Sequence, residues 1–230
     1  MVAPEQPDPD TAAPDPVQSS ERPAGDGSSG AAYPWPSHTL MAMLLVRHGT
    51  TTQDLPDHDV LDFDDTPLTS DGYRRAITIG TQLAPAHVPV VFTSDCRRSV
   101  ETATPWAVMG QAQVSAAKVL RPWDRRGLIG LGEKEVGKLL EYYVRNPTAT
   151  PIGGGETFAQ YCARFVPFVW ICMTEPGLMG MITHSTGART ICALVAQGLP
   201  VCPDTYLSVE CLKPGQAAFV TATRFEPLDL

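Results

Sequence analysis

The sequence predicts an α/β domain, a three-layer α/β/α sandwich with a mostly parallel central sheet, preceded by a disordered tail. From residue 43 onward, short apolar runs alternate with segments whose apolar residues recur at helical spacing. This alternation is typical of a parallel sheet covered by helices on both faces. Residues 1–40 differ, because they hold eight of the 22 prolines and six acidic residues against one arginine. Such a segment buries too little apolar surface to fold, so we expect the folded domain to span 41–230.

The expected strands are short apolar runs rich in Val, Ile, Leu and Met. The first is a run that stops abruptly at Arg-His-Gly, and the last two are joined by Pro214-Gly215, a turn-forming dipeptide. In chain order, we expect strands at 43–47, 88–93, 118–120, 178–183, 206–212 and 217–223.

The expected helices lie between these strands and show apolar residues on one face. Segment 133–146 carries Val136, Leu139 and Tyr143 at helical spacing and is stopped by Pro147. In chain order, we expect helices at 72–83, 99–109, 133–146, 156–173 and 187–197. Segment 54–65 is expected to be a solvated acidic loop, because its carboxylates do not have the spacing of a calcium loop. Segment 127–134 is expected to be a turn, because Glu133 occupies the lysine position of a P-loop.

Composition excludes several classes of partner. The net charge of −8 and pI near 5.0 argue against a nucleic-acid or membrane-surface binder, which would present a basic face. The longest apolar run, 165–173, is too short to span a bilayer. The six cysteines form no C-x-x-C pair, which argues against a zinc or redox site. Because the N-terminus also lacks the basic and apolar pattern of a signal peptide, we expect reduced thiols and a cytoplasmic protein.

Two histidines follow expected strands directly. His48 lies in Arg47-His48-Gly49, and His184 lies in Thr183-His184-Ser185. In open α/β sheets, ligands bind in the crevice outside the carboxyl ends of the strands. Two imidazoles delivered to that crevice, together with arginines, predict a site for an anion and for nucleophilic chemistry.

Two further segments are expected at the same crevice. Thr93–Ser99 follows a strand and opens a helix, and it carries Arg98; Gly154-Gly155-Glu156 begins another helix. Helix N-termini bind anions, and the planar guanidinium of arginine matches phosphate with two parallel hydrogen bonds. A neutral imidazole can attack phosphorus and hold the phosphoryl group covalently. The pattern therefore points to phosphoryl transfer.

These motifs, in this order, resemble the histidine phosphatase superfamily, the fold shared by phosphoglycerate mutases and many broad phosphatases. The resemblance covers 43 to about 222 and rests on the Arg-His-Gly signature of its branch. Further matching segments are Asp65–Gly72, Thr93–Ala103 with Arg98 in the functional position, Gly154–Thr157 followed by Arg164, and Ile182–His184.

The resemblance implies a role for each site residue. His48 would be the nucleophile that becomes phosphohistidine, while Arg47, Arg98 and His184 would clamp the phosphoryl oxygens. Thr51 and the backbone at Ser185 would add hydrogen bonds. No metal or other cofactor is expected, because the arginines and the imidazole supply positive charge.

The general acid is the one role that departs from the family pattern. The family usually has a glutamate in Leu-Arg-Glu, whereas this chain has Pro122 at that position. Asp124, two residues further on, is the candidate, and Glu133 is a weaker rival.

The sequence thus favours a metal-independent phosphomonoester hydrolase that acts on a small phosphorylated substrate through a phosphohistidine at His48. Two alternatives stay open: a mutase that returns the phosphoryl group to another hydroxyl, and a non-catalytic protein that binds a phosphate ligand. The motifs do not identify the substrate or the oligomeric state.

Overall fold

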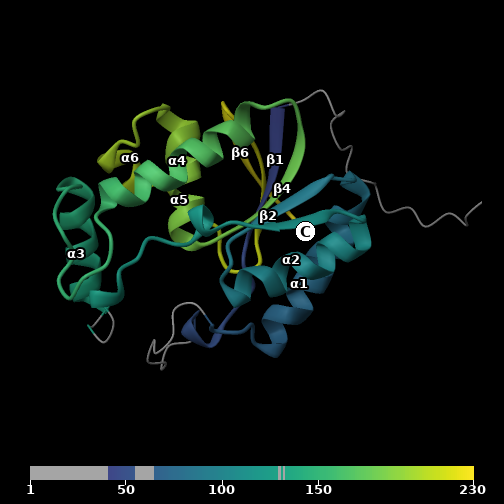
Figure 1. Cartoon of the computed structure of the whole chain (residues 1–230), viewed down its shortest axis with the longest axis horizontal. Helices are drawn as coiled ribbons and strands as arrows, with labels where there is room; N and C mark the ends of the chain where they lie inside the picture. Colours follow the sequence, from purple (N-terminus) through teal and green to yellow (C-terminus); the bar gives the residue numbers. More distant parts are fainter. Residues whose placement is uncertain (1–40, 55–64, 129–130, 132) are drawn as a thin grey trace, which may run out of the picture. The chain divides into compact units, whose positions relative to one another are not determined.

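The central sheet has the parallel character that the sequence predicts. In the computed structural model, which describes residues 41–54, 65–128, 131 and 133–230, six strands form one sheet in the order β3-β2-β4-β1-β5-β6 (Figure 1). Strands β3, β2, β4 and β1 are parallel, and β5 pairs antiparallel with both β1 and β6. The strands are β1 (Met41–Arg47), β2 (Val90–Thr93), β3 (Gln113–Ala116), β4 (Gly177–Thr183), β5 (Ala217–Thr221) and β6 (Arg224–Leu228).

Helices cover both faces of this sheet. Figure 1 shows α1 and α2 together on one side and α4 and α5 on the other, with α3 and α6 beyond α4 and α5. The helices are α1 (Ser70–Leu83), α2 (Arg97–Gly110), α3 (Glu133–Arg145), α4 (Phe158–Thr174), α5 (Ser185–Gln197) and α6 (Pro203–Ser208). Short 3₁₀ helices are η1 (Thr52–Asp54), η2 (Ala84–Ala86), η3 (Lys118–Leu120) and η4 (Arg126–Leu128). The predicted α/β/α sandwich is confirmed.

Strand β1 shows why its sequence is apolar throughout. Successive side chains of a strand point to opposite faces. Leu44 belongs to the core cluster that includes α1 and α2, whereas Leu45 belongs to the cluster that includes α4 and α5. Both are fully buried, and burial of each such side chain stabilises the fold by roughly 1.5–3 kcal/mol. A strand buried on both faces therefore needs an unbroken apolar run.

The expected strand at 206–212 is wrong. This region contains α6, whose Pro203 occupies a first-turn position where its missing N–H costs nothing. Tyr206 lies on this helix and is buried. Its ring packs against that of Phe158, with ring centroids 4.9 Å apart. The C-terminal hairpin is instead β5–β6, which turns after Thr221.

The expected strand at 118–120 is also wrong, because those residues form η3. The strand is β3, which lies at the edge of the sheet next to β2. Its side chains are largely exposed and half of them are polar, so an apolar run does not mark it.

Three predictions fall wholly or partly outside the described residues: the disordered tail at 1–40, most of the acidic loop at 54–65, and the middle of the turn at 127–134, whose ends lie in η4 and α3. Within the described ranges, no helix has the length and apolar character needed to cross a membrane.

Candidate active site

The two histidines meet because β1 and β4 are neighbours in parallel register. Arg47 and Thr183 are register partners at the carboxyl ends of these strands. The backbone N–H of His48 continues the pairing by donating to the Thr183 carbonyl at 2.9 Å. The rings of His48 and His184 consequently lie edge to face, with centroids 5.1 Å apart. The predicted convergence of the two strand ends is therefore present in the fold.

His48 is held as a neutral imidazole with a defined free nitrogen. Its Nδ1 lies 2.8 Å from the Gly49 carbonyl oxygen. Because a carbonyl can only accept, Nδ1 carries the proton and Nε2 carries the lone pair. Burial, and then the positive charge of Arg98, lower the pKa of His48 to about 4. At neutral pH this imidazole is therefore uncharged.

His184 is the N-cap residue of α5 and is also buried. Its Nε2 lies 2.8 Å from the Ser94 hydroxyl and 3.2 Å from that of Ser99. Its Nδ1 is buried and has no partner among the described residues. Burial, followed by the neighbouring His48, holds the pKa of His184 well below its usual range. An unpartnered polar atom at this depth is costly unless a ligand satisfies it.

Arg47 is oriented by contacts at both of its terminal nitrogens. One terminal nitrogen donates to the Leu212 carbonyl at 2.9 Å, and the other lies 3.2 Å from Asp54 Oδ1. Its Nε is buried without a partner in the described part of the chain. The Thr51 hydroxyl, predicted to contact phosphate, donates to Asp54 Oδ2 at 2.7 Å in this structure. Thr51 thus supports the Asp54 carboxylate that orients Arg47, a link that the sequence analysis missed.

Arg98 enters the site from the first turn of α2 and is buried. Its charge lowers the pKa of both imidazoles, so it lies close to both rings. The Thr102 hydroxyl joins α2 to the histidine turn, because it donates to the Arg98 carbonyl at 2.7 Å and accepts the Gly49 N–H at 3.0 Å. By contrast, Arg97 is half-exposed and pairs with Glu101 at 2.8 Å, as expected for a neighbour outside the site.

Two close backbone approaches fix the turn after β1. At Gly72, a Cβ atom would lie 2.2 Å from the Thr50 carbonyl oxygen, so only glycine fits. On the other side, the Gly215 N–H lies 3.1 Å from the Arg47 carbonyl oxygen and 3.0 Å from that of His48. Gly215 has φ of 70°, a left-handed conformation that glycine adopts freely. The Pro214-Gly215 turn therefore supports the site instead of joining two strands.

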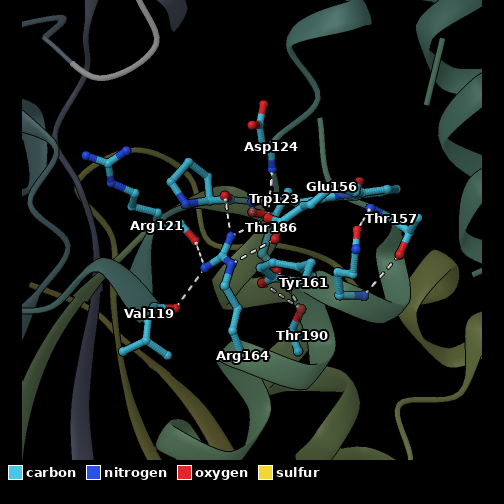
Figure 2. A network of polar contacts seen from close by, with 12 residues as sticks. Val119, Arg121, Trp123, Asp124, Glu156, Thr157, Tyr161, Arg164, Thr186 and Thr190 are labelled. Atoms are coloured by element: carbon cyan, nitrogen blue, oxygen red, sulfur yellow. Dashed lines mark hydrogen bonds and ion pairs between the residues drawn. The ribbon is translucent and has the colours of Figure 1, made fainter. Parts of the chain in front are cut away.

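Asp124 is engaged by a neighbouring cation. Arg126 Nε lies 3.0 Å from both carboxylate oxygens of Asp124. This contact is the main reason that the pKa of Asp124 lies below its ordinary value. Figure 2 shows the carboxylate directed away from the polar network beneath it. In this arrangement Asp124 is ionised at neutral pH, whereas a general acid must be protonated.

Arg164 organises the segment before Asp124, a role that its sequence position did not reveal. Its guanidinium donates to the carbonyls of Val119, Arg121 and Pro122 at 2.8–2.9 Å and to Glu156 (Figure 2). One partly buried cation thus satisfies one carbonyl of η3 and two of the segment that follows it, which explains how this part of the chain holds its conformation.

Two carboxylates complete this framework. Glu156, bound by Arg164, accepts the Asp124 N–H at 3.0 Å. Asp95, in the loop before α2, forms a bidentate pair with Arg121 at 2.6 and 2.8 Å. The framework therefore links segment 119–124 to both the start of α4 and the loop before α2.

The start of α5 offers backbone donors beside the histidines. Ser185, predicted to contribute there, is the first residue of that helix and follows His184 directly. The first N–H groups of a helix have no partners within it and attract anions. Among the described residues, no group of three or more His, Cys, Asp or Glu side chains is placed to hold a metal ion.

Several solved structures share this fold. Mycobacterial glucosyl-3-phosphoglycerate phosphatase, solved in complex with VO3, matches with a TM-score of 0.63 at 19% identity, covering 81% of this chain and 96% of that one. The alpha-ribazole phosphatase from Shigella flexneri has a TM-score of 0.62 at 16% identity (81% and 94% covered). YhfR of Bacillus stearothermophilus has a TM-score of 0.64 at 20% identity (81% and 94% covered). At these identities the likeness concerns the fold alone.

Sequence comparison identifies the family. No curated protein gave a significant match to the chain. The family model described as "Histidine phosphatase superfamily (branch 1)" matches residues 43–211, which include both site histidines and both site arginines. With the paired histidines at the ends of β1 and β4, this match shows that the chain belongs to the histidine phosphatase superfamily.

Proposed function

We propose that this protein is a metal-independent phosphomonoester hydrolase that works through a phosphohistidine at His48. One observation carries the proposal: His48 is neutral with its Nε2 lone pair free, and the charges of Arg98 and Arg47 and the ring of His184 lie close to it. Similar solved structures include proteins named as phosphatases, which supports the same class of reaction.

In the first step, His48 Nε2 attacks the phosphorus of the bound ester. The phosphorus–nitrogen bond forms as the bond to the alcohol oxygen breaks, and that oxygen takes up a proton. Arg47, Arg98 and His184 hold the phosphoryl oxygens, where charge must be stabilised during transfer. The Arg47 Nε and the His184 Nδ1 have no partner in the described part of the chain, so a phosphoryl oxygen would satisfy them; because both atoms are inaccessible in this structure, the proposal requires that substrate binding opens a path to them.

In the second step, a water molecule attacks the phosphorus of phosphohistidine. The phosphorus–nitrogen bond breaks, the carboxylate that protonated the leaving alcohol takes up the proton that the water loses, inorganic phosphate leaves, and His48 returns to its neutral state with Nδ1 still protonated. The Gly49 carbonyl keeps the same tautomer through both steps.

Asp124 is the proposed donor of the leaving-group proton. Because Arg126 holds Asp124 ionised in the structure, the proposal requires that substrate binding separates this pair. The same ion pair is the observation that favours the alternative of a phosphate-binding protein without turnover. The mutase alternative makes the same phosphohistidine and differs only in what accepts the phosphoryl group.

Charge and thiol chemistry support the proposed substrate class and location. A net charge of −8 argues against nucleic acid or an anionic membrane surface, which need an extended basic face, whereas a small phosphorylated ester needs only local positive charge such as that of Arg47 and Arg98. All six cysteines are free, which fits a reducing compartment such as the cytoplasm.

The test is phosphate release from p-nitrophenyl phosphate with a metal chelator present. We expect turnover by the wild-type protein, loss of turnover in His48→Asn, and retention in His87→Asn, whose imidazole is exposed. Binding of phosphate without turnover of any ester in a broad panel would establish the non-catalytic alternative. Formation of an isomeric ester in place of free phosphate would establish the mutase.

A further inference from the structure

A cavity of about 340 Å³ lies beside the start of α5, outside the histidine cluster. It is enclosed by α3, α5, α6 and the segment that follows Pro122, and its walls include Trp123, Arg125, Leu140, Ser185, Arg189 and Tyr206. Neither histidine and neither site arginine lines it. Its volume falls in the range of small-molecule sites.

Arg125 is a partly buried cation that pairs with no carboxylate among the side chains that the structure describes. Its Nε is inaccessible and makes no hydrogen bond in the described part of the chain. Its guanidinium carbon lies 5.9 Å from the centre of the Trp123 ring. Burial lowers the pKa of Arg125, and the like charge of Arg189 lowers it further. Because an arginine stays charged in proteins, this positive charge is held in the fold at a cost.

Arg189 brings a second guanidinium to the same cavity. One of its terminal nitrogens donates to the carbonyls of Tyr206 and Leu207, near the end of α6, at 3.3 Å each. Its guanidinium carbon lies 5.8 Å from the centre of the Tyr206 ring. No carboxylate of the described residues pairs with it or with Arg125.

The cavity arginines differ in this respect from the arginines around them, which have carboxylate partners. The neighbouring arginines are each neutralised: Arg121 by Asp95, Arg126 by Asp124, and Arg164 by Glu156. Two arginines that lie close together without a neighbouring carboxylate repel each other. Such an arrangement is expected at a site where a bound anion supplies the missing negative charge.

The cavity also adjoins the proposed phosphoryl site. Ser185 lines it, and Ser185 follows His184 in the chain, so their Cα atoms are about 3.8 Å apart. We propose that this cavity binds a second anionic group, a carboxylate or a phosphate, on the leaving-group side of the phosphomonoester substrate. Arg125 and Arg189 are its ligands. This inference rests on the proposed function, because it places the substrate phosphoryl group at His48.

The experiment measures binding, so that it does not depend on turnover. Isothermal titration of the His48→Asn protein compares three probes: glycerol 3-phosphate, 3-phosphoglycerate, which adds a carboxylate, and glycerol 1,3-bisphosphate, which adds a phosphate. We expect at least one of the doubly anionic probes to bind about tenfold or more tightly than glycerol 3-phosphate. The preferred probe identifies the anion.

Variants then assign that preference to the cavity. Arg125→Gln and Arg189→Gln are each added to His48→Asn. Each should reduce the ratio of the affinity for the preferred doubly anionic probe to the affinity for glycerol 3-phosphate to near one. The affinity for glycerol 3-phosphate itself should stay within about twofold. The matched control Arg224→Gln removes an exposed arginine from β6 and should leave the preference intact. If Arg125, whose Nε is inaccessible, cannot be replaced without loss of fold, Arg189→Gln alone decides.

The inference is overturned if neither anionic probe binds more tightly than glycerol 3-phosphate, or if the arginine variants weaken all three probes equally. Failure of the proposed function would give a different result from failure of this inference. The wild-type protein would then hydrolyse none of the three probes, whatever their relative affinities.

Discussion

The charge state of His48 follows from its surroundings and has consequences for stability as well as chemistry. Burial and Arg98 both disfavour the imidazolium. The contact between Nδ1 and Gly49 then selects which nitrogen is free to react. The sequence predicted the residue and its role but not this tautomer, because the tautomer depends on how the backbone folds back after His48.

Acid should destabilise the fold through His48. Its pKa is about 4 when folded and about 6.5 when unfolded, so between these values the unfolded chain binds more protons. The free energy of unfolding must then fall as the pH decreases, by about 2 kcal/mol for this group between pH 8 and pH 5. Urea unfolding at both pH values measures the loss, which should be smaller by that amount in His48→Asn. Equal losses in the two proteins would contradict the assigned pKa.

Neighbouring arginines in α2 provide a matched pair of variants. Arg98→Met removes a buried cation from the proposed phosphoryl site and should lower kcat about 10²–10³-fold, as for other groups that stabilise transition-state charge. Arg97→Met removes the adjacent half-exposed cation and should leave kcat nearly unchanged. Steady-state rates on p-nitrophenyl phosphate give the comparison, and similar losses in both variants would argue against the assignment.

The proposed role of Asp124 can be separated from a structural one by the leaving group. A general acid matters most when the departing oxygen is strongly basic. Asp124→Asn should therefore slow hydrolysis of an alkyl phosphate about 10²–10⁴-fold, but that of p-nitrophenyl phosphate far less. If both esters slow equally, Asp124 is not the proton donor and the Arg126 ion pair is structural.

At the scale of elements, two helical glycines should respond in opposite ways to the same change. In α1, a Cβ on Gly72 would lie 2.2 Å from the Thr50 carbonyl oxygen, whereas in α3 a Cβ on Gly137 would meet nothing within 4 Å. Gly72→Ala should destabilise the fold by about 1–3 kcal/mol through this overlap. Gly137→Ala should stabilise it by up to about 1 kcal/mol through helix propensity. Urea unfolding measures both, and a stabilising Gly72→Ala would mean that the close approach is absent.

The elements also show where sequence patterns succeed. Strands β1 and β4 were predicted because burial on both faces demands continuous apolar runs. β3 was missed because an edge strand is under no such demand. The segment at 206–212 was assigned wrongly because a short apolar stretch fits either a strand or one turn of helix. There, Pro203 was the signal for the helix start.

At the scale of the whole molecule, the site is assembled from segments that are distant in the chain. Parallel strands deliver their carboxyl ends to one edge of a sheet, so the meeting of His48 with His184 was predictable from the order of the elements. The contacts of Arg164 with carbonyls more than 40 residues away were not. Such links depend on tertiary packing, which leaves no periodic signal. The unbalanced charge of Arg125 was hidden for the same reason.

The central claim is that the phosphoryl group passes through Nε2 of His48. The most direct measurement is rapid quenching of the protein with substrate under non-acidic conditions, followed by mass spectrometric mapping of the phosphorylated residue. The account predicts one phosphoryl group on His48 of the wild-type protein and of His87→Asn, and none on His48→Asn. A phosphoryl group on another residue, or full turnover by His48→Asn, would contradict it.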